Sequence, residues 1–182
     1  MFIREPDAVE AFGLFFRILY TALARAAGKS FIHASAAVRG DGAVLFVGPS
    51  GAGKTTAIRL FGGRIIHDDT VFLGGEDDGP LVETAPFMGD ESFIYGPMEH
   101  FRVTKIFLLY KDARAFLAPA SKASALGRLL TLPWEETGSG WTRDIEGYLA
   151  AGMRRCKHLV EMADCYELHF TRERLPEESM RN

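Results

Sequence analysis

A glycine-rich segment near residue 50 constrains this chain more than any other feature. It reads Gly48-Pro49-Ser50-Gly51-Ala52-Gly53-Lys54-Thr55 and matches the pattern G-x-x-x-x-G-K-[ST], the phosphate-binding P-loop. Glycines at these positions let the backbone turn so that successive N–H groups point at phosphate oxygens, and the positive end of a following helix adds to the attraction. The motif therefore predicts that this segment and Thr56 bind a nucleotide, with Lys54 on the β- and γ-phosphates and the Thr55 hydroxyl on Mg²⁺.

The flanking residues supply the setting that this motif requires. Residues 43–47 form an apolar run typical of a buried strand, and residues 54–61 have a helical pattern that two glycines end. A chance match to the motif in such a chain has a probability of roughly 1 in 100. A glycine turn between strand and helix that binds no ligand is the alternative interpretation.

A nucleotide-bound Mg²⁺ needs a carboxylate, usually at the end of a neighbouring strand. Residues 64–67 have a strand pattern followed directly by Asp68 and Asp69, and we expect this strand to lie beside the P-loop strand. One carboxylate would hold Mg²⁺ together with Thr55, while the other accepts a proton from an attacking hydroxyl. Asp112, at the end of a later apolar strand, is the alternative metal ligand.

The rest of the chain alternates between strand and helix patterns, which favours a single α/β domain over residues 1–182 with a mixed, mostly parallel central sheet flanked by helices. An amphipathic helix is predicted over about residues 6–28, and its Phe-rich face would pack in the core or against a second copy in a homo-oligomer. Further strands are predicted at 30–38, 105–110 and 165–170, short strands and loops at 71–101, helices at 121–132 and 142–162, and a frayed polar tail at about 172–182.

The composition excludes several classes of protein. Lys and Arg number 21 against 24 Asp and Glu, giving a net charge of −3, whereas a nucleic-acid-binding protein normally has a basic excess. The apolar stretch 11–27 contains Arg17 and Arg25, so it has neither the uncharged length of a membrane span nor the basic start of a signal peptide. We therefore expect a cytoplasmic protein that binds neither nucleic acid nor membrane, with Cys156 and Cys165 as buried free thiols.

His33 lies fifteen positions before Gly48. Together with the P-loop, the short helix and the pair Asp68 and Asp69, it resembles the catalytic core of HPr kinase/phosphorylase. More distantly, the pattern is similar to the nucleotide core of ATP-dependent phosphoenolpyruvate carboxykinase. The resemblance spans about residues 30–172 and implies a P-loop core of this type, with ATP and Mg²⁺ as cofactors and His33 next to the phosphates or the metal. The chain departs from the true HPr kinases because it lacks their glycine-containing signature segment after the core, so we do not expect HPr as its substrate.

These features predict an ATP-dependent phosphotransferase that acts on a hydroxyl. Its catalytic residues would be Asp68, Asp69, Lys54 and His33. The segments 74–97 and 135–140 carry glycines and acids rather than a closed apolar pocket, which favours a protein or peptide serine as acceptor, because a macromolecule brings its own surface to exclude water. Two alternatives stay open. One is a different P-loop small-molecule kinase or nucleotide hydrolase in which Asp112 holds the metal, and the other is a non-catalytic nucleotide-binding interaction module.

Overall fold

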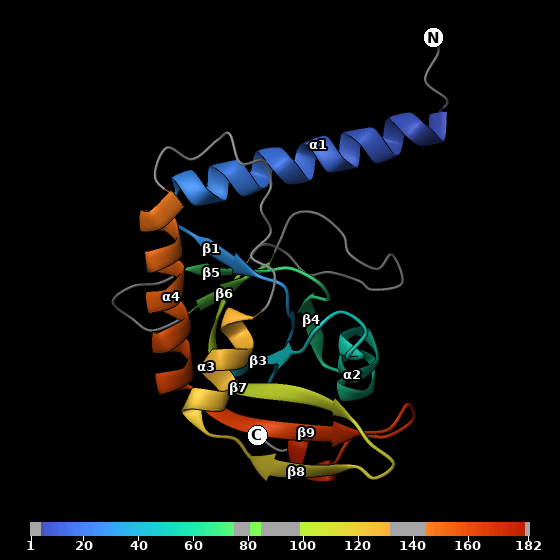
Figure 1. The fold of residues 1–182 in the computed structure, drawn as a ribbon. Helices are drawn as coiled ribbons and strands as arrows, with labels where there is room; N and C mark the ends of the chain where they lie inside the picture. The colour runs from blue at the N-terminus through green and yellow to red at the C-terminus, as the bar shows by residue number, and fades with distance from the viewer. Residues whose placement is uncertain (1–4, 75–80, 85–98, 132–144, 181–182) are drawn as a thin grey trace.

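The computed structural model describes residues 5–74, 81–84, 99–131 and 145–180 (Figure 1). Its strands are β1 (Ser30–Ile32), β2 (Ser35–Arg39), β3 (Gly42–Val47), β4 (Arg64–His67), β5 (Val71–Gly74), β6 (Leu81–Glu83), β7 (His100–Lys111), β8 (Phe116–Pro119) and β9 (Asp164–Phe170). Its helices are α1 (Glu5–Ala26), α2 (Lys54–Phe61), α3 (Lys122–Leu130), α4 (Ile145–Met162) and the short 3-10 helix η1 (Glu177–Met180).

The described strands form one mixed sheet, and helices flank it, as predicted. The strand order is β1-β5-β6-β7-β3-β2-β4; β9 pairs with the C-terminal part of β7, and β8 lies beyond β9. The expectation of a mostly parallel sheet is wrong for this part of the chain, because only the pairs β3–β7 and β7–β9 are parallel. The turn at residues 40–41 joins β2 to β3 as a hairpin, which makes that pair antiparallel, and the remaining antiparallel pairs join strands that lie farther apart in the sequence or are separated by other elements.

Alternating side chains in the central strands divide the core into two layers. In β3, Leu45 and Val47 belong to the cluster that includes residues of α3 and α4, whereas Phe46 belongs to the cluster that includes α2. The neighbouring strand β7 repeats this alternation with Leu108 and Phe107. Because both faces are covered, these strands are continuous apolar runs, and the predicted buried strands at 43–47 and 105–110 are confirmed.

Helix α1 lies across one end of the sheet, and its N-terminal part extends past the sheet (Figure 1). The Tyr20 ring meets the Phe72 ring edge-on at 5.2 Å between centroids, and Ala24 is buried in the same small cluster. The other apolar face is 37–68% exposed at the positions described, which are Phe12, Phe15, Phe16, Leu19 and Leu23. The prediction that this face packs in the core is therefore wrong for these side chains, while contact with a second copy stays a prediction. Among the described helices, none is both long enough and apolar enough to cross a membrane.

The predicted strand over residues 30–38 is two strands with different partners. β1 pairs with β5, whereas β2 pairs with β3 and β4. The chain changes partner at His33 and Ala34, where the Ala34 N–H donates to the Ile32 carbonyl at 3.0 Å. Side-chain propensity favours a strand on both sides of this turn, so the sequence pattern does not reveal the break.

The acid-bearing strand also lies one strand farther from the glycine-rich segment than predicted. β4 pairs with β2 rather than with β3. Because β2 is antiparallel to both β3 and β4, the C-terminal ends of β3 and β4 nevertheless lie at the same edge of the sheet. Asp68 and Asp69 therefore follow a strand end on the same side as the glycine-rich segment.

The C-terminal part of the chain differs from the predicted frayed tail. Leu175 is buried in the cluster on the α2 face, and Ser179 of η1 is buried as well. Ser179 donates a hydrogen bond through Oγ to the Pro176 carbonyl at 2.6 Å. The sequence also did not predict β8, whose four residues pair with β9 at the edge of the sheet.

Candidate functional site

The glycine-rich loop, residues 48–53, connects the buried end of β3 to the first turn of α2. Gly53 is the N-terminal cap of α2 and has φ +95°, a left-handed conformation that other residues rarely adopt. A Cβ atom at Gly53 would lie 2.9 Å from Cζ of Phe170, at the end of β9. The loop is therefore held close against the ends of the central strands by a position that only glycine fills.

The side chain of Lys54 folds back over the glycine-rich loop. Its Nζ donates to the carbonyls of Gly48 at 3.1 Å and Pro49 at 3.4 Å, and the residue is only 7% exposed. Burial lowers the pKa of Lys54, and the negative charge of Asp69 acts in the opposite direction. A lysine ammonium in the loop and a carboxylate after β4 thus lie close enough to affect each other electrostatically.

Asp69 has a histidine neighbour. Nδ1 of His33 lies 3.1 Å from Oδ1 of Asp69, and the two side chains are 18% and 36% exposed. His33 lies in the turn between β1 and β2, and Asp69 comes after β4. The pairing of β2 with β4 brings the two residues together. The structure therefore places the predicted His33, Lys54 and Asp69 in one region at the same edge of the sheet.

His67 shapes the turn that carries the two acids. Its Nδ1 accepts hydrogen bonds from the backbone N–H groups of Asp69 at 3.1 Å and Thr70 at 2.9 Å. A ring nitrogen that accepts in this way has no proton to donate, so the Oδ1 atom of Asp68 at 3.7 Å from it is a close neighbour rather than a salt-bridge partner. Asp68 is 6% exposed, and its carbonyl accepts a hydrogen bond from the Ser35 hydroxyl.

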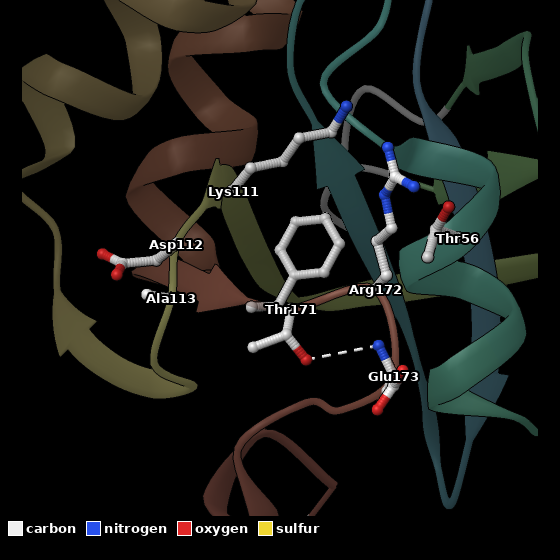
Figure 2. A pocket seen from close by; sticks show the side chains of 8 residues that line it. Thr56, Lys111, Asp112, Ala113, Thr171, Arg172 and Glu173 are labelled. Atoms are coloured by element: carbon white, nitrogen blue, oxygen red, sulfur yellow. Dashed lines mark hydrogen bonds between the residues drawn. The ribbon is translucent and has the colours of Figure 1, made fainter.

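A pocket of about 1050 Å³ opens on the other side of the glycine-rich loop (Figure 2). Its lining residues are Thr56, Lys111, Asp112, Ala113, Phe170, Thr171, Arg172 and Glu173. Figure 2 shows the Lys111 and Arg172 side chains extending toward the first turn of α2, where Thr56 lies. The Cε atom of Lys111 is 3.3 Å from the point that a Cβ on Gly53 would occupy. Two cations therefore flank the loop on this side.

Sequence reasoning missed both cations as members of a site. Lys111 is the last residue of β7, and Arg172 follows the end of β9. In the structure β3, β7 and β9 run parallel, so the residues that follow each strand meet at the same edge of the sheet. The sequence does not show the order of the strands, so it does not show that these residues meet.

Asp112, the alternative metal ligand, is among the residues that line this pocket, and its carboxylate points away from Lys111 and Arg172 (Figure 2). It follows β7, whereas Asp69 follows β4 on the opposite side of β3. The Asp112 carboxylate accepts from the Arg114 N–H at 3.2 Å and lies 3.0 Å from Nδ1 of His169. The bond from Arg114, followed by that from His169, lowers the pKa of Asp112 below its usual value. The His169 ring is stacked on that of Phe116, with centroids 4.0 Å apart.

The oxygen donors of this site suit Mg²⁺. In the part of the chain that the structure describes, no group of three or more His, Cys, Asp or Glu side chains is arranged to hold a metal ion. Mg²⁺ does not need such a group, because it keeps several waters and binds to one or two carboxylates together with substrate phosphates. Thr55, half-buried in the first turn of α2, and the carboxylates of Asp68 and Asp69 are donors of this kind.

Two segments that bear on the acceptor lie largely outside the described residues. These are 74–97, of which only Gly74 and residues 81–84 are described, and 135–140, of which none is.

The comparison with protein-family models gives no match to this chain. The comparison with curated proteins gives no match either.

Proposed function

We propose that this chain is an ATP- and Mg²⁺-dependent phosphotransferase that moves the γ-phosphoryl group of ATP to a hydroxyl. In this reaction the acceptor oxygen bonds to the γ-phosphorus, the bond to the β-phosphate oxygen breaks, and the hydroxyl proton leaves, giving a phosphate ester and ADP. The observation that supports it best is the position of Asp69. This carboxylate contacts His33 and acts electrostatically on Lys54, the lysine of a loop with the P-loop sequence.

The glycine-rich loop and α2 would hold the phosphates. Loop N–H groups and the N-terminus of α2 donate to phosphate oxygens, while the Lys54 ammonium leaves the Gly48 and Pro49 carbonyls to contact the β- and γ-phosphates. This exchange replaces neutral acceptors with charged ones, which form stronger hydrogen bonds. Thr55 and Asp68 would hold Mg²⁺, which would supply positive charge that offsets the negative charge of the phosphates.

Asp69 would receive the proton of the acceptor hydroxyl. It is the more exposed of the two acids, so an acceptor from solution reaches it more easily than the buried Asp68. His33 fixes the orientation of the carboxylate through its contact with Oδ1. Phosphoryl transfer depends mainly on positioning and charge stabilisation, so a carboxylate held in place by a second side chain contributes to both.

The acceptor that we propose is a serine hydroxyl of a protein or peptide. Ser50 and Pro49 at the tip of the glycine-rich loop are exposed, and Asp69 is partly exposed, so the region where transfer would occur is accessible to a large partner. A protein acceptor covers such a surface and excludes water from the γ-phosphate, which limits wasteful hydrolysis.

Incubation of the purified chain with radiolabelled ATP, Mg²⁺ and a phosphatase-treated cell lysate tests this function. We expect label on a protein or peptide with the unmodified chain and none with Asp69→Asn, while the exposed turn variant Asp41→Asn transfers normally. Transfer by Asp69→Asn at the unmodified rate would contradict the mechanism. Release of inorganic phosphate without any labelled acceptor would favour a hydrolase, and ATP binding with neither outcome would favour a non-catalytic interaction module.

A further inference from the structure

The two charged regions of the site lie on opposite sides of the glycine-rich loop. Asp69 follows β4, and in the sheet order β4 and β2 lie on one side of β3. Lys111 and Arg172 follow β7 and β9, which lie on the other side of β3. The loop that follows β3 therefore separates an acidic side from a side with two cations.

This separation orients a bound nucleotide. The γ-phosphate must lie on the acidic side, because the proposed acceptor base and metal ligands are there. A triphosphate is a linear chain held along the loop, so its α-phosphate and nucleoside must lie on the opposite side. Thr56, one residue beyond Thr55 in the first turn of α2, lines the pocket on that side.

We propose that the pocket beside Thr56 binds the nucleoside half of the nucleotide, and that Lys111 and Arg172 contact its α-phosphate. This inference rests on the proposed function, because the acidic side fixes the direction of the triphosphate. The Lys111 and Arg172 side chains extend toward the first turn of α2, where the α-phosphate would lie (Figure 2).

The lining of the pocket suits a sugar and a base better than a second polyanion. Its lining includes two acidic residues, Asp112 and Glu173, whose negative charges disfavour a second polyanion there. The Phe170 ring adds an apolar surface next to Gly53. The volume of about 1050 Å³ is at the upper end of the range for small-molecule sites, and a nucleoside fits within it.

Calorimetric titration with two ligands tests this inference separately from the proposed function. Inorganic tripolyphosphate carries three phosphates without a nucleoside, so it reports on the loop alone, whereas ATP reports on the loop and the pocket. We expect the unmodified chain to bind ATP more tightly than tripolyphosphate in the presence of Mg²⁺, by about tenfold or more. Lys54→Met should weaken both ligands, because both need the loop.

A bulky substitution in the pocket gives the decisive comparison. Ala113→Trp should weaken ATP binding about tenfold and leave tripolyphosphate binding unchanged, because the indole fills space needed only by the nucleoside. Ala150→Trp, on an exposed position of α4 outside the pocket, is the matched control and should change neither affinity. Lys111→Met and Arg172→Met, at exposed positions that tolerate substitution, should each weaken ATP binding about tenfold through the lost α-phosphate contact.

The possible failures are distinguishable. Equal affinity of the unmodified chain for ATP and tripolyphosphate, or unchanged ATP binding by Ala113→Trp and by both methionine variants, would overturn the pocket assignment and leave the loop as the phosphate site. If the unmodified chain bound neither ligand, or if Lys54→Met bound both normally, the proposed function itself would fail. Thermal unfolding of each variant shows whether it is folded, and the exposed methionine variants remain informative if Ala113→Trp is not.

Discussion

Nδ1 of His33 lies 3.1 Å from Oδ1 of Asp69, although the two residues come from turns after different strands. His33 lies where the chain leaves its pairing with β5 and begins its pairing with β3 and β4, next to the segment after β4 that carries Asp69. This position places a potential orienting group beside the carboxylate that also acts on Lys54.

Substitution of His33 should slow phosphoryl transfer more than it affects nucleotide binding. His33→Ala removes the contact that orients Asp69, and we expect transfer to fall roughly tenfold to a hundredfold, the range for loss of a group that orients a functional ligand. The affinity for ATP should stay within about twofold, because His33 is not part of the proposed phosphate contacts. His100→Ala, which removes an exposed histidine at the start of β7, is the control and should transfer normally. Equal rates for the two variants would contradict the role of His33.

Substitution of His67 should destabilise the turn that carries the acids. His67→Ala leaves the N–H groups of Asp69 and Thr70 without their acceptor in a mostly buried turn, at a cost of about 2–4 kcal/mol in the free energy of unfolding. His67→Asn keeps an acceptor oxygen and should recover part of that loss. Urea unfolding of both variants measures the difference, and an alanine variant as stable as the unmodified chain would refute this account of the turn.

The sequence predicted the strand before the glycine-rich loop, the helix after it and the strand before the two acids correctly, because these elements depend on local residue patterns. The glycines around Lys54 and the strand before them form a continuous pattern, and α2 ends at residue 61 as the two following glycines indicated. Asp69 was a candidate because it comes just after a predicted strand. Its contact with His33 could not be derived from residue types, because it depends on the pairing of β2 with β4.

The pocket was missed for a different physical reason. Lys111 and Arg172 lie far apart in the sequence, and each resembles an ordinary charged residue after a strand. They meet because β9 pairs in parallel with β7 and brings its end to the same edge. Pairing of that kind depends on the packing of the whole sheet, and local propensity does not encode it. The burial of Leu175 in the C-terminal segment was also missed, because the many charged residues around it predict a solvent-exposed tail.

The two cysteines should resist thiol reagents while the protein is folded. Both thiols are buried, and burial raises the pKa of Cys156 to about 12 and also raises that of Cys165. The thiolate is the reactive form, so at pH 8 almost none is present in the folded chain. We expect iodoacetamide to label neither residue appreciably in the native protein and both after denaturation, as measured by mass spectrometry. Rapid labelling of Cys156 in the folded chain would contradict its burial.

A pair of glycine substitutions should separate a required glycine from a replaceable one. Gly53→Ala places a side chain at φ +95° and against the Phe170 ring, and we expect a loss of about 1–3 kcal/mol in unfolding free energy together with weaker ATP binding. Gly127→Ala lies within α3, where a Cβ would meet no atom within 4 Å. That change should stabilise the protein by about 0.5–1 kcal/mol, because alanine favours the helix. A stabilising effect at Gly53 would show that the loop adopts a different conformation.

Removal of the Lys54 charge should stabilise the protein while it weakens nucleotide binding. Burial lowers the pKa of Lys54, which means that the folded state disfavours its charged form despite the nearby Asp69. Since the folded pKa lies below the unfolded one, the destabilising contribution is present at neutral pH and disappears only as pH rises past both values. Lys54→Met keeps the length of the side chain without its charge and should raise the unfolding free energy at pH 7 by about 0.5–2 kcal/mol, as is common when a functional group is replaced.

Lys111→Met, at an exposed lysine of the same region, is the control and should change the unfolding free energy by less than about 0.5 kcal/mol. Chemical denaturation without ligand measures both values, and a Lys54→Met variant less stable than Lys111→Met would show that its bonds to the Gly48 and Pro49 carbonyls outweigh the cost of the buried charge.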